Sequence, residues 1–460
     1  MDRCHCIARE ELDPVIGHIG GAYRGCLVVA GGYESRNRIY HFRQPNFLYI
    51  LPYSFSKAAT VSPEVWIEYK VGGDVPLPTS ASIGLIHEDY LYQFGGTHED
   101  NPIYPTAINT TNRLYRLDLK NGMWEFLSPK TANERQPSPR TFSVAFGTSK
   151  GVYYWGGYGP RSKMFHKQQL FLTDPAASTV FENKGNNSYC WTNQLIMFDT
   201  ETLSWNVVKQ GGEVPEPRCG GASAHDVDRN LFFISGGRCK DVKYNDFYML
   251  DLGSFVWTKF TLQVPRHIAD MQWPSMTKCL TEDYFILSIY YEEPGVSTYL
   301  PRFERLRLDI DVDNKKVVAT NIEHPVKPNC WSLRAFIDNA FVEYGGFTRG
   351  LDRSFNCSRM LVEVQAGPTH LTPLIARDSE TTEEASVEAS SAAFSSTSNV
   401  EVSPILETRM QWRDKMNNFY KRYNLIQEVR KTKPTYEGDT QRTMPDLSLQ
   451  QIFDVFDVAP

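Results

Sequence analysis

Long apolar runs are missing from this 460-residue sequence. No window approaches the roughly 18 apolar residues that are needed to span a membrane. The first residues, MDRCHCIAREELDP, lack the apolar core of a signal peptide. Positive charge is not in excess either, because the formal net charge is −6 and gives no sign of a general nucleic-acid binder. We therefore expect no membrane or nucleic-acid partner, and a cytoplasmic or nuclear location.

Paired cysteines and catalytic constellations are also lacking. The nine Cys residues are odd in number and scattered without CxxC pairs, so we expect reduced thiols rather than a disulfide framework. The ten His residues do not combine with other side chains into a nucleophile–base pair or a metal-ligand pattern. The sequence therefore predicts a protein that is not an enzyme and that holds neither a cofactor nor a metal.

A Gly-Gly pair after an apolar run recurs five times along the chain. The clearest copy lies between Leu231 and Trp257, where LFFISGG is followed by a polar loop, a second apolar run and a Trp. Apolar runs of this kind predict fully buried inner strands, and the glycines permit the positive φ that is needed where a strand leaves the core. The pairs begin at Gly31, Gly95, Gly156, Gly236 and Gly345.

These repeats define six units. The fifth unit is degenerate, because YFILSIYY at 284–291 lacks the Gly-Gly pair. A further strand-like run follows it at 305–312. Units of about 50 residues with four strands, a Gly-Gly pair and a downstream aromatic residue are the kelch signature, and such units stack radially. The sequence thus predicts an all-β, six-bladed kelch β-propeller over residues 15–377. Seven blades are the alternative if residues 365–377 do more than close the last blade.

The composition changes after the repeats. Residues 378–403 are rich in Ser, Thr and Glu, which predicts a disordered linker. Residues 404–431 are predicted to form an amphipathic helix, whose apolar stripe folds back on the propeller, binds a partner or stays partly disordered. Residues 432–460 are expected to be a flexible tail. Its last run, DLSLQQIFDVFDVAP, is either a docking motif or a cap on the propeller.

Residues directly after the Gly-Gly pairs converge at one end of the channel of a propeller. They are Tyr33, Thr97, Tyr158, Arg238 and Phe347, and the turns between units add Arg140, Arg218, Arg266 and Arg334. Tyr and Arg side chains around one cavity favour an anion on an extended chain, such as a peptide carboxylate, which the planar Arg fork matches. The alternative is structural, because an Arg after Pro at the start of a blade often binds loop carbonyls.

The chain resembles the kelch-domain-containing substrate receptors of cullin–RING ubiquitin ligases, which capture C-terminal degrons. The resemblance is carried by GGYG at 156–159, a long insertion, WTNQLIMFDTETLSW at 191–205, ISGGR, and KYNDFYMLDL at 243–252. It implies a non-catalytic module that holds the carboxylate of C-terminal peptides of client proteins. The peptide-binding residues that the match implies are Arg238, Lys243, Tyr158, Trp191, Trp273, Gln272 and Tyr33.

Three positions depart from the family pattern. Lys243 and Tyr189 stand where the family has Arg, and Gln272 stands where it has Ser. The family's short adaptor-binding helix, roughly Ser/Thr-Leu-x-x-x-Cys, has its nearest counterpart in SLQQIF at 448–453, with Phe in place of Cys. An elongin-type adaptor and a cullin are the further partners that the resemblance implies. The alternative is a kelch scaffold for cytoskeletal or signalling partners without a ligase.

Overall fold

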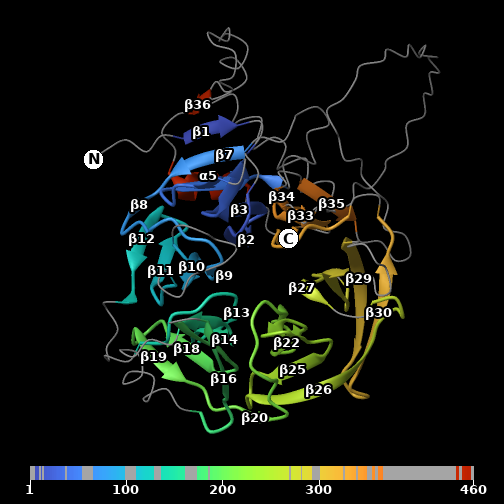
Figure 1. Ribbon diagram of the computed structural model, residues 1–460. Helices are drawn as coiled ribbons and strands as arrows, with labels where there is room; N and C mark the ends of the chain where they lie inside the picture. Colours follow the sequence, from blue (N-terminus) through green and yellow to red (C-terminus); the bar gives the residue numbers. More distant parts are fainter. Residues whose placement is uncertain are drawn as a thin grey trace, which may run out of the picture.

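Six twisted blades surround a central channel in the computed structural model (Figure 1). The structure describes residues 6–9, 12, 15–36, 39–53, 66–98, 110–128, 136–160, 174–184, 187–268, 271–280, 282–292, 301–324, 327–337, 340–349, 355–357, 361–365, 442–444 and 448–456. The blades follow one another around the ring in chain order, which confirms the predicted six-bladed, all-β propeller. In these parts of the chain, no helix is long and apolar enough to cross a membrane.

The strands of each blade are ordered outward from the channel. Blades 1 to 3 consist of β2 (Ile19–Tyr23), β3 (Cys26–Ala30), β6 (Phe47–Leu51) and β7 (Trp66–Lys70); β9 (Ile83–His87), β10 (Tyr90–Phe94), β11 (Leu114–Asp118) and β12 (Met123–Phe126); and β13 (Val144–Thr148), β14 (Gly151–Trp155), β18 (Leu195–Asp199) and β19 (Ser204–Val207). Blades 4 to 6 consist of β21 (Ala222–Asp226), β22 (Leu231–Ser235), β25 (Phe247–Asp251) and β26 (Val256–Gln263); β27 (Gln272–Lys278), β28 (Phe285–Glu292), β29 (Pro301–Asp311) and β30 (Lys316–Ile322); and β31 (Leu333–Ile337), β32 (Ala340–Tyr344) and β35 (Leu361–Gln365).

The strands nearest the channel are not the apolar runs. The first strand of each blade neighbours the first strand of the next blade around the whole ring. The apolar runs form the second strands, and in β3 and β14 all five residues are buried. The sequence correctly predicted their burial but placed them one strand too far inward. Neighbouring blades cover both faces of these second strands, so burial does not require a position at the channel.

The five Gly-Gly pairs follow the second strands of blades 1, 2, 3, 4 and 6. In every pair both glycines are left-handed, with φ from 62° to 71° at the first and from 81° to 107° at the second. Space is short as well: a Cβ on Gly96 would lie 2.2 Å from Ser82 Oγ, and one on Gly157 would lie 2.3 Å from Ser143 Oγ. Blade 5 has no such pair, and β28 pairs with β29 along its whole length, from Phe285 to Glu292.

Short hairpins project where the Gly-Gly pairs end the second strands. Tyr33, Tyr158, Arg238 and Phe347 each begin one, directly after a pair. The strands are β4 (Tyr33–Arg36) and β5 (Ile39–Phe42); β15 (Tyr158–Pro160), β16 (Thr179–Lys184) and β17 (Asn187–Thr192); β23 (Arg238–Cys239) and β24 (Val242–Lys243); and β33 (Phe347–Arg349) and β34 (Phe355–Cys357). We call the end of the propeller that carries them the hairpin face.

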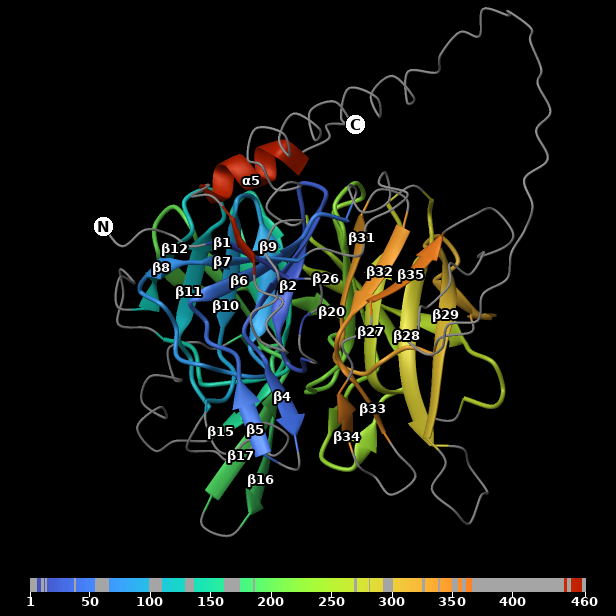
Figure 2. The same ribbon diagram turned by 90° about the horizontal axis from the view of Figure 1, so that it is seen from above.

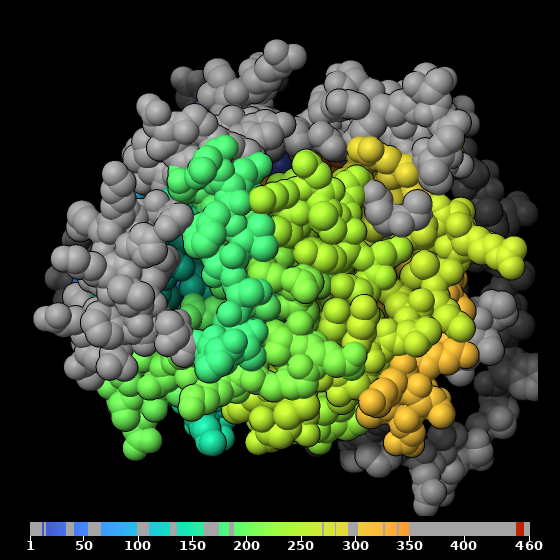
Figure 3. Space-filling view, turned by 60° about the horizontal axis from the view of Figure 1, so that its bottom comes forward, coloured from blue at the N-terminus to red at the C-terminus, as the bar shows by residue number. Residues whose placement is uncertain are grey.

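Parallel pairing links the outer edges of successive blades. The chain leaving blade 1 adds β8 (Gly72–Gly73) to β12, and the chain leaving blade 3 adds β20 (Gly211–Gly212) to β26. Between blades 4 and 5 the same link is an unbroken strand, because the end of β26 pairs with β30. Blades 4 and 5 therefore share one nine-stranded sheet, and the chain of blades 3 to 5 forms a continuous green-to-yellow surface in Figure 3.

Both ends of the chain attach to blade 1. Strand β1 (Cys6–Arg9) pairs with the outermost strand β7, and β36 (Arg442–Met444) pairs with β1. Helix α5 (Leu449–Phe456) lies on the end of the propeller opposite the hairpins, as Figure 2 shows. We call this end the helix face.

The apolar side of α5 is part of the core between blades 1 and 2. Leu449, Ile452 and Phe453 are at most 1 % exposed, and the Phe453 ring meets the Tyr23 ring edge-on with centroids 4.7 Å apart. Ser448 and Gln451 form a reciprocal capping box at the start of the helix, with bonds of 2.9 and 3.2 Å. Where the sequence predicted a flexible tail, residues 442–456 thus hold two regular elements. Of the two alternatives for its last run, the cap on the propeller is the one observed.

Other expectations for the C-terminal part lie outside the described residues. The linker at 378–403 and the amphipathic helix at 404–431 are among them, as are residues 366–377, on which the seven-blade alternative depends. The six Cys residues with described side chains are buried.

The packing of α5 predicts a large loss of stability on truncation of its central ring. Phe453→Ala removes a buried aromatic side chain and should lower the free energy of unfolding by about 3 kcal/mol. Gln451→Ala, on the exposed side of the same helix, should cost about 1 kcal/mol or less. Urea titrations followed by tryptophan fluorescence check both values. Equal, small effects would show that α5 is not docked.

Candidate functional site

The first strands of all six blades begin at the hairpin face, and each is preceded by a left-handed residue. These residues occupy corresponding positions just before, or at, the start of the strand. They are Gly17 (φ 65°), Ala81 (54°), Phe142 (55°), Gly220 (64°), Trp273 (45°) and Trp331 (54°). A ring of left-handed residues therefore surrounds the channel at this end of the propeller.

Three members of this ring carry aromatic side chains that meet across the channel. The ring centroids of Phe142 and Trp273 are 5.4 Å apart, those of Phe142 and Trp331 are 5.1 Å apart, and those of Trp273 and Trp331 are 4.9 Å apart. We call Phe142, Trp273 and Trp331 the aromatic triad. A left-handed conformation costs a non-glycine residue roughly 1–2 kcal/mol, and such strain is concentrated at functional sites.

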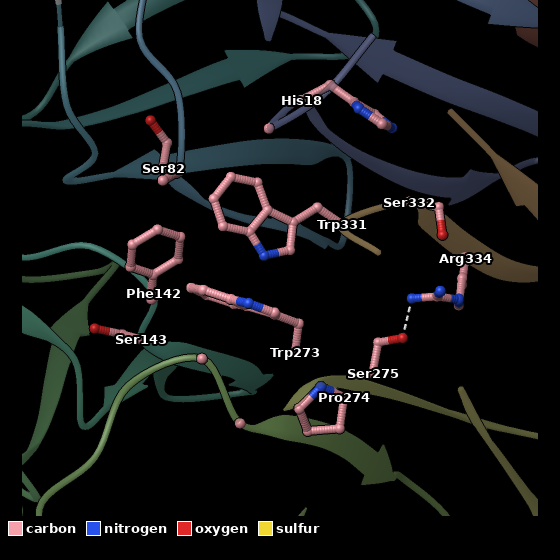
Figure 4. Close-up of a pocket in the computed structure, with 14 residues that line it drawn as sticks. His18, Ser82, Phe142, Ser143, Trp273, Pro274, Ser275, Trp331, Ser332 and Arg334 are labelled. Carbon is pink, nitrogen blue, oxygen red and sulfur yellow. Dashed lines mark hydrogen bonds between the residues drawn. The ribbon is translucent and has the colours of Figure 1, made fainter. Parts of the chain in front are cut away.

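A cavity of about 220 Å³ lies at the aromatic triad (Figure 4). The ring of left-handed residues and the residues that follow them line it. Polar groups in the lining come from His18, Ser82, Ser143, Ser275, Ser332 and Arg334. The cavity therefore combines an aromatic wall with hydroxyl groups and one cation.

Arg238 lies at the outer side of the triad. Its side chain is exposed, and its guanidinium carbon is 4.9 Å from the centroid of the Trp273 ring. Strand β23 holds it in place, because its backbone pairs with Cys219 on one side and with Lys243 on the other. Lys243 is also exposed. The structure thus places both predicted cations in one small hairpin beside the mouth of the cavity.

Tyr158 and Trp191 form a second aromatic wall on blade 3. Their ring centroids are 4.6 Å apart, and Tyr189 stacks on Tyr158 at 5.3 Å with an interplanar angle of 5°. Trp191 is 5 % exposed and packs with Cys219 and the aromatic residue Phe142 of the triad. Burial raises the pKa of the Tyr158 hydroxyl, and the neighbouring Tyr189 raises it further, so the group stays protonated at neutral pH. The predicted tyrosine and tryptophan therefore lie next to Arg238's hairpin.

The remaining two predicted residues lie deeper or farther from the mouth. Tyr33 is fully buried and packs with Ile16, Tyr290 and Phe347 between blades 1, 5 and 6. Trp273 and Trp331 pack against this cluster, and Tyr33 itself does not line the cavity. Gln272 is half-buried at the start of β27, where it pairs with Tyr290.

The arginines of the turns separate into two groups. Arg140 donates to Ser138 and to the Gly156 carbonyl, and Arg218 donates to the Gly236 carbonyl and to both carboxylate oxygens of Asp246. Both side chains are buried, so the structural alternative is correct for them. Arg266 is exposed in the loop after β26 and is not part of the lining, whereas Arg334 is.

Sequence reasoning missed two members of the aromatic triad. Phe142 and Trp331 are each followed by Ser, and each of these dipeptides lies just before the first strand of its blade. Trp273 occupies the corresponding place in blade 5, with Pro274 inserted before Ser275. Alignment of the units on their first strands, rather than on the Gly-Gly pairs, would have revealed the pattern.

Metal binding has no candidate in the described parts of the chain. There, no three His, Cys, Asp or Glu side chains are grouped so that they could hold an ion.

The family model of the KLHDC2/KLHL20/DRC7 Kelch-repeats domain matches residues 17–279, which is more than half of the chain. The chain belongs to this kelch-repeat family. The match spans blades 1 to 4 and the start of blade 5, and it includes Arg238, Trp191 and Trp273. Kelch propellers of this family are protein-interaction modules, and this coarse assignment holds for the present chain.

Similar proteins agree with the family assignment. Kelch domain-containing protein 2 of Bos taurus is 24 % identical over 349 residues, which cover 73 % of this chain and 76 % of the relative. Kelch domain-containing protein 1 of Mus musculus is 26 % identical over 292 residues, covering 61 % and 63 %. A solved structure titled "Structure of YjhT" superimposes with a TM-score of 0.54 at 12 % identity, over 79 % of this chain and 99 % of that one. The last likeness shows the fold alone.

The strained triad of this kelch propeller predicts an inverted order of stability for Gly and Ala variants. Trp331→Gly and Trp331→Ala remove the same ring contacts, but only Gly adopts φ 54° without strain. The Gly variant should therefore be more stable by about 0.5–1 kcal/mol, even though Gly has the more flexible unfolded chain.

A matched pair at Phe341 is the control, because this residue is buried in strand β32. There Ala should be the more stable substitute by about 0.5–1 kcal/mol. Urea unfolding of the four variants gives the comparison. An Ala variant that is the more stable one at both positions contradicts a strained triad.

Proposed function

We propose that this kelch propeller is a non-catalytic module that binds the C-terminal peptides of client proteins through their terminal carboxylate. One observation carries the proposal: an exposed Arg238 stacks on Trp273 at the mouth of a polar-lined cavity. A guanidinium that is stacked by its face keeps its edges available, and these edges match a carboxylate bidentately.

Charge and shape around Arg238 support the same ligand. Lys243 adds a second positive charge from the paired strand of the hairpin. The Tyr158–Trp191 wall and the aromatic triad offer apolar surface to the peptide chain, while serine hydroxyls offer hydrogen bonds. A charge-assisted hydrogen bond of this kind contributes roughly 1.5–3 kcal/mol. We infer that the free carboxylate is the main determinant of binding.

Binding should therefore depend on the carboxylate and on Arg238. From a random peptide library that presents free C-termini, the strongest binder is made in acid and amide forms and titrated by fluorescence anisotropy. Arg238→Ala should weaken the acid form about 10- to 150-fold, which corresponds to one charge-assisted bond. Arg266→Ala, an exposed Arg of the same face outside the cavity, should change the affinity less than twofold.

Two results would contradict the proposal. One is a library that yields no binder to the wild-type chain. The other is an amide form that binds as tightly as the acid form.

We further propose that an elongin-type adaptor and a cullin associate with the chain through the Ser448–Phe453 run of α5. The resemblance to ligase receptors supports this partner class. The docked helix restricts it, because Leu449, Ile452 and Phe453 face the propeller. Adaptor binding therefore requires α5 to leave the helix face. A second candidate function, a kelch scaffold without a ligase, is favoured by this burial.

Release of α5 distinguishes the two candidates. Arg24 binds Asp454 of α5 at 2.9 Å, so Arg24→Glu places two carboxylates together and should loosen the helix without changing its sequence. In affinity purifications, the ligase proposal predicts more adaptor and cullin with Arg24→Glu than with wild type, and none with Leu449→Ala. If adaptor and cullin are absent from all three samples, the ligase proposal is wrong and the scaffold function is supported.

A further inference from the structure

Two neighbouring turns on the helix face expose large apolar side chains. Val227 lies between β21 and β22 of blade 4, and Leu280 lies between β27 and β28 of blade 5. They are 73 % and 66 % exposed, the highest values for large apolar side chains in the described parts of the chain. Val256, at the start of β26, is 41 % exposed at the same end of blade 4. We call these three residues the apolar patch.

Ion pairs join the turns that carry Val227 and Leu280. Arg229 in the turn of blade 4 donates to Asp226 at 2.6 Å and to Asp283, in the turn of blade 5, at 3.0 Å. Asp226 is fully buried, so this end of the bridge is fixed to the core of blade 4. The two exposed apolar side chains therefore belong to one surface that spans both blades.

The surface around the apolar patch is acidic. The turns at this end of blades 4 and 5, with the adjoining strand ends, are residues 226–230, 251–255, 278–284 and 307–316. They contain eight Asp or Glu and five Lys or Arg, so their net charge is −3. Four of the carboxylates are exposed, those of Asp228, Asp283, Asp311 and Asp313. A partner that covers the patch should therefore carry positive charge at its edges.

Blades 1 and 2 show how the helix face binds a helix. There, α5 buries its apolar side against the turns, and its single charged residue, Asp454, binds Arg24 of the β2–β3 turn at 2.9 Å. The backbone N–H of Gln450 also donates to the Lys120 carbonyl in the β11–β12 turn. Apolar contact and opposite charge thus act together. The apolar patch offers the same combination with acidic turns, so it fits an amphipathic helix with basic residues.

A segment of this chain has that composition. The sequence predicts an amphipathic helix at 404–431, which contains seven Lys or Arg and three Asp or Glu, a net charge of +4. Its apolar stripe consists of Trp412, Met416, Phe419, Tyr423 and Ile426.

The segment is also long enough to reach the patch. Ten residues, 432–441, connect it to β36 on blade 1, and they extend to about 35 Å. A helix of its 28 residues adds about 42 Å, whereas about 30 Å already matches the diameter of a small domain. The covalent connection therefore allows the segment to cross the helix face.

We propose that residues 404–431 dock as a helix on the apolar patch of their own chain, with the apolar stripe on Val227 and Leu280 and with basic residues against the acidic turns. This inference goes beyond the proposed function and does not depend on peptide binding. Together with α5, the segment then covers two opposite sectors of the helix face, blades 1 and 2 and blades 4 and 5. The hairpin face stays open.

Hydrogen–deuterium exchange of the full chain, read by mass spectrometry, tests the docking. An amphipathic helix owes most of its stability to the packing of its apolar face, so peptides from 404–431 should be protected only while docked. The double variant Val227→Lys/Leu280→Lys replaces apolar contact by positive charge and should lower this protection about tenfold or more. The control is Leu77→Lys, another exposed leucine but on the hairpin face, which should change the protection less than twofold.

Carbodiimide coupling of an equimolar mixture of ¹⁴N- and ¹⁵N-labelled wild-type chains tests whether the contact lies within one chain. It should join Lys415 or Lys421 to Asp228 or Asp283 within one isotope, and this result does not depend on how the variants fold. Pairs of mixed isotope would show that the segment docks on a second copy and would overturn the inference. Fast exchange of 404–431 in the wild type, or equal protection in the wild type and the double variant, would overturn it as well.

Discussion

Each blade begins its first strand from a left-handed residue, and the hairpin face depends on this constraint. The backbone turns sharply there, and the strand then runs down the channel. In blades 1, 3, 4 and 6 the residue before this turn pairs with the first residue of the hairpin of its own blade. This conformation directs a side chain toward the channel. Blades 1, 2 and 4 have Gly17, Ala81 and Gly220 at this place and leave space open. Blades 3, 5 and 6 have the large rings of the aromatic triad. The same turn therefore produces the cavity where its residue is small and the aromatic wall where its residue is large.

Most of the fold could be predicted because its signals are local. The Gly-Gly pairs are required by φ and by the nearness of Ser82 and Ser143, so their spacing shows the blades directly. The degenerate fifth blade was recognised from its apolar strand alone. Burial on both faces keeps β28 apolar although no Gly-Gly pair follows it. The position of the apolar strands within a blade could not be predicted from the sequence. Burial is equal for any strand that is covered on two sides, and composition cannot order such strands from the channel outward.

Part of the candidate site could be located from the sequence. The residues that could be located follow a local motif, whereas the others come together only when the ring of blades closes. Arg238, Lys243, Tyr158 and Trp191 lie in hairpins that follow the Gly-Gly pairs, so a sequence motif places them. Phe142 and Trp331 depend on closure of the ring, which brings blades 3 and 6 into contact across the channel. A single arginine could not be assigned from sequence either. Arg140 and Arg218 have acceptors for their main donors, whereas Arg334 shares one carboxylate and keeps a buried donor unpaired. The acceptors that identify Arg140 and Arg218 as structural come from distant parts of the chain, so they are visible only in the coordinates.

Helix α5 shows how a short motif acquires meaning from its surroundings. The Ser448–Gln451 capping box and the apolar residues that follow indicate a helix, but the same apolar residues suit an adaptor groove or the propeller itself. In the structure, the turns of blades 1 and 2 provide a pocket for Leu449, Ile452 and Phe453, and Arg24 provides a partner for Asp454. The helix face and the hairpin face lie at opposite ends of the channel (Figure 2). A partner that competes for α5 therefore does not compete with a peptide at Arg238. The proposed peptide site and the proposed adaptor site are therefore spatially separate.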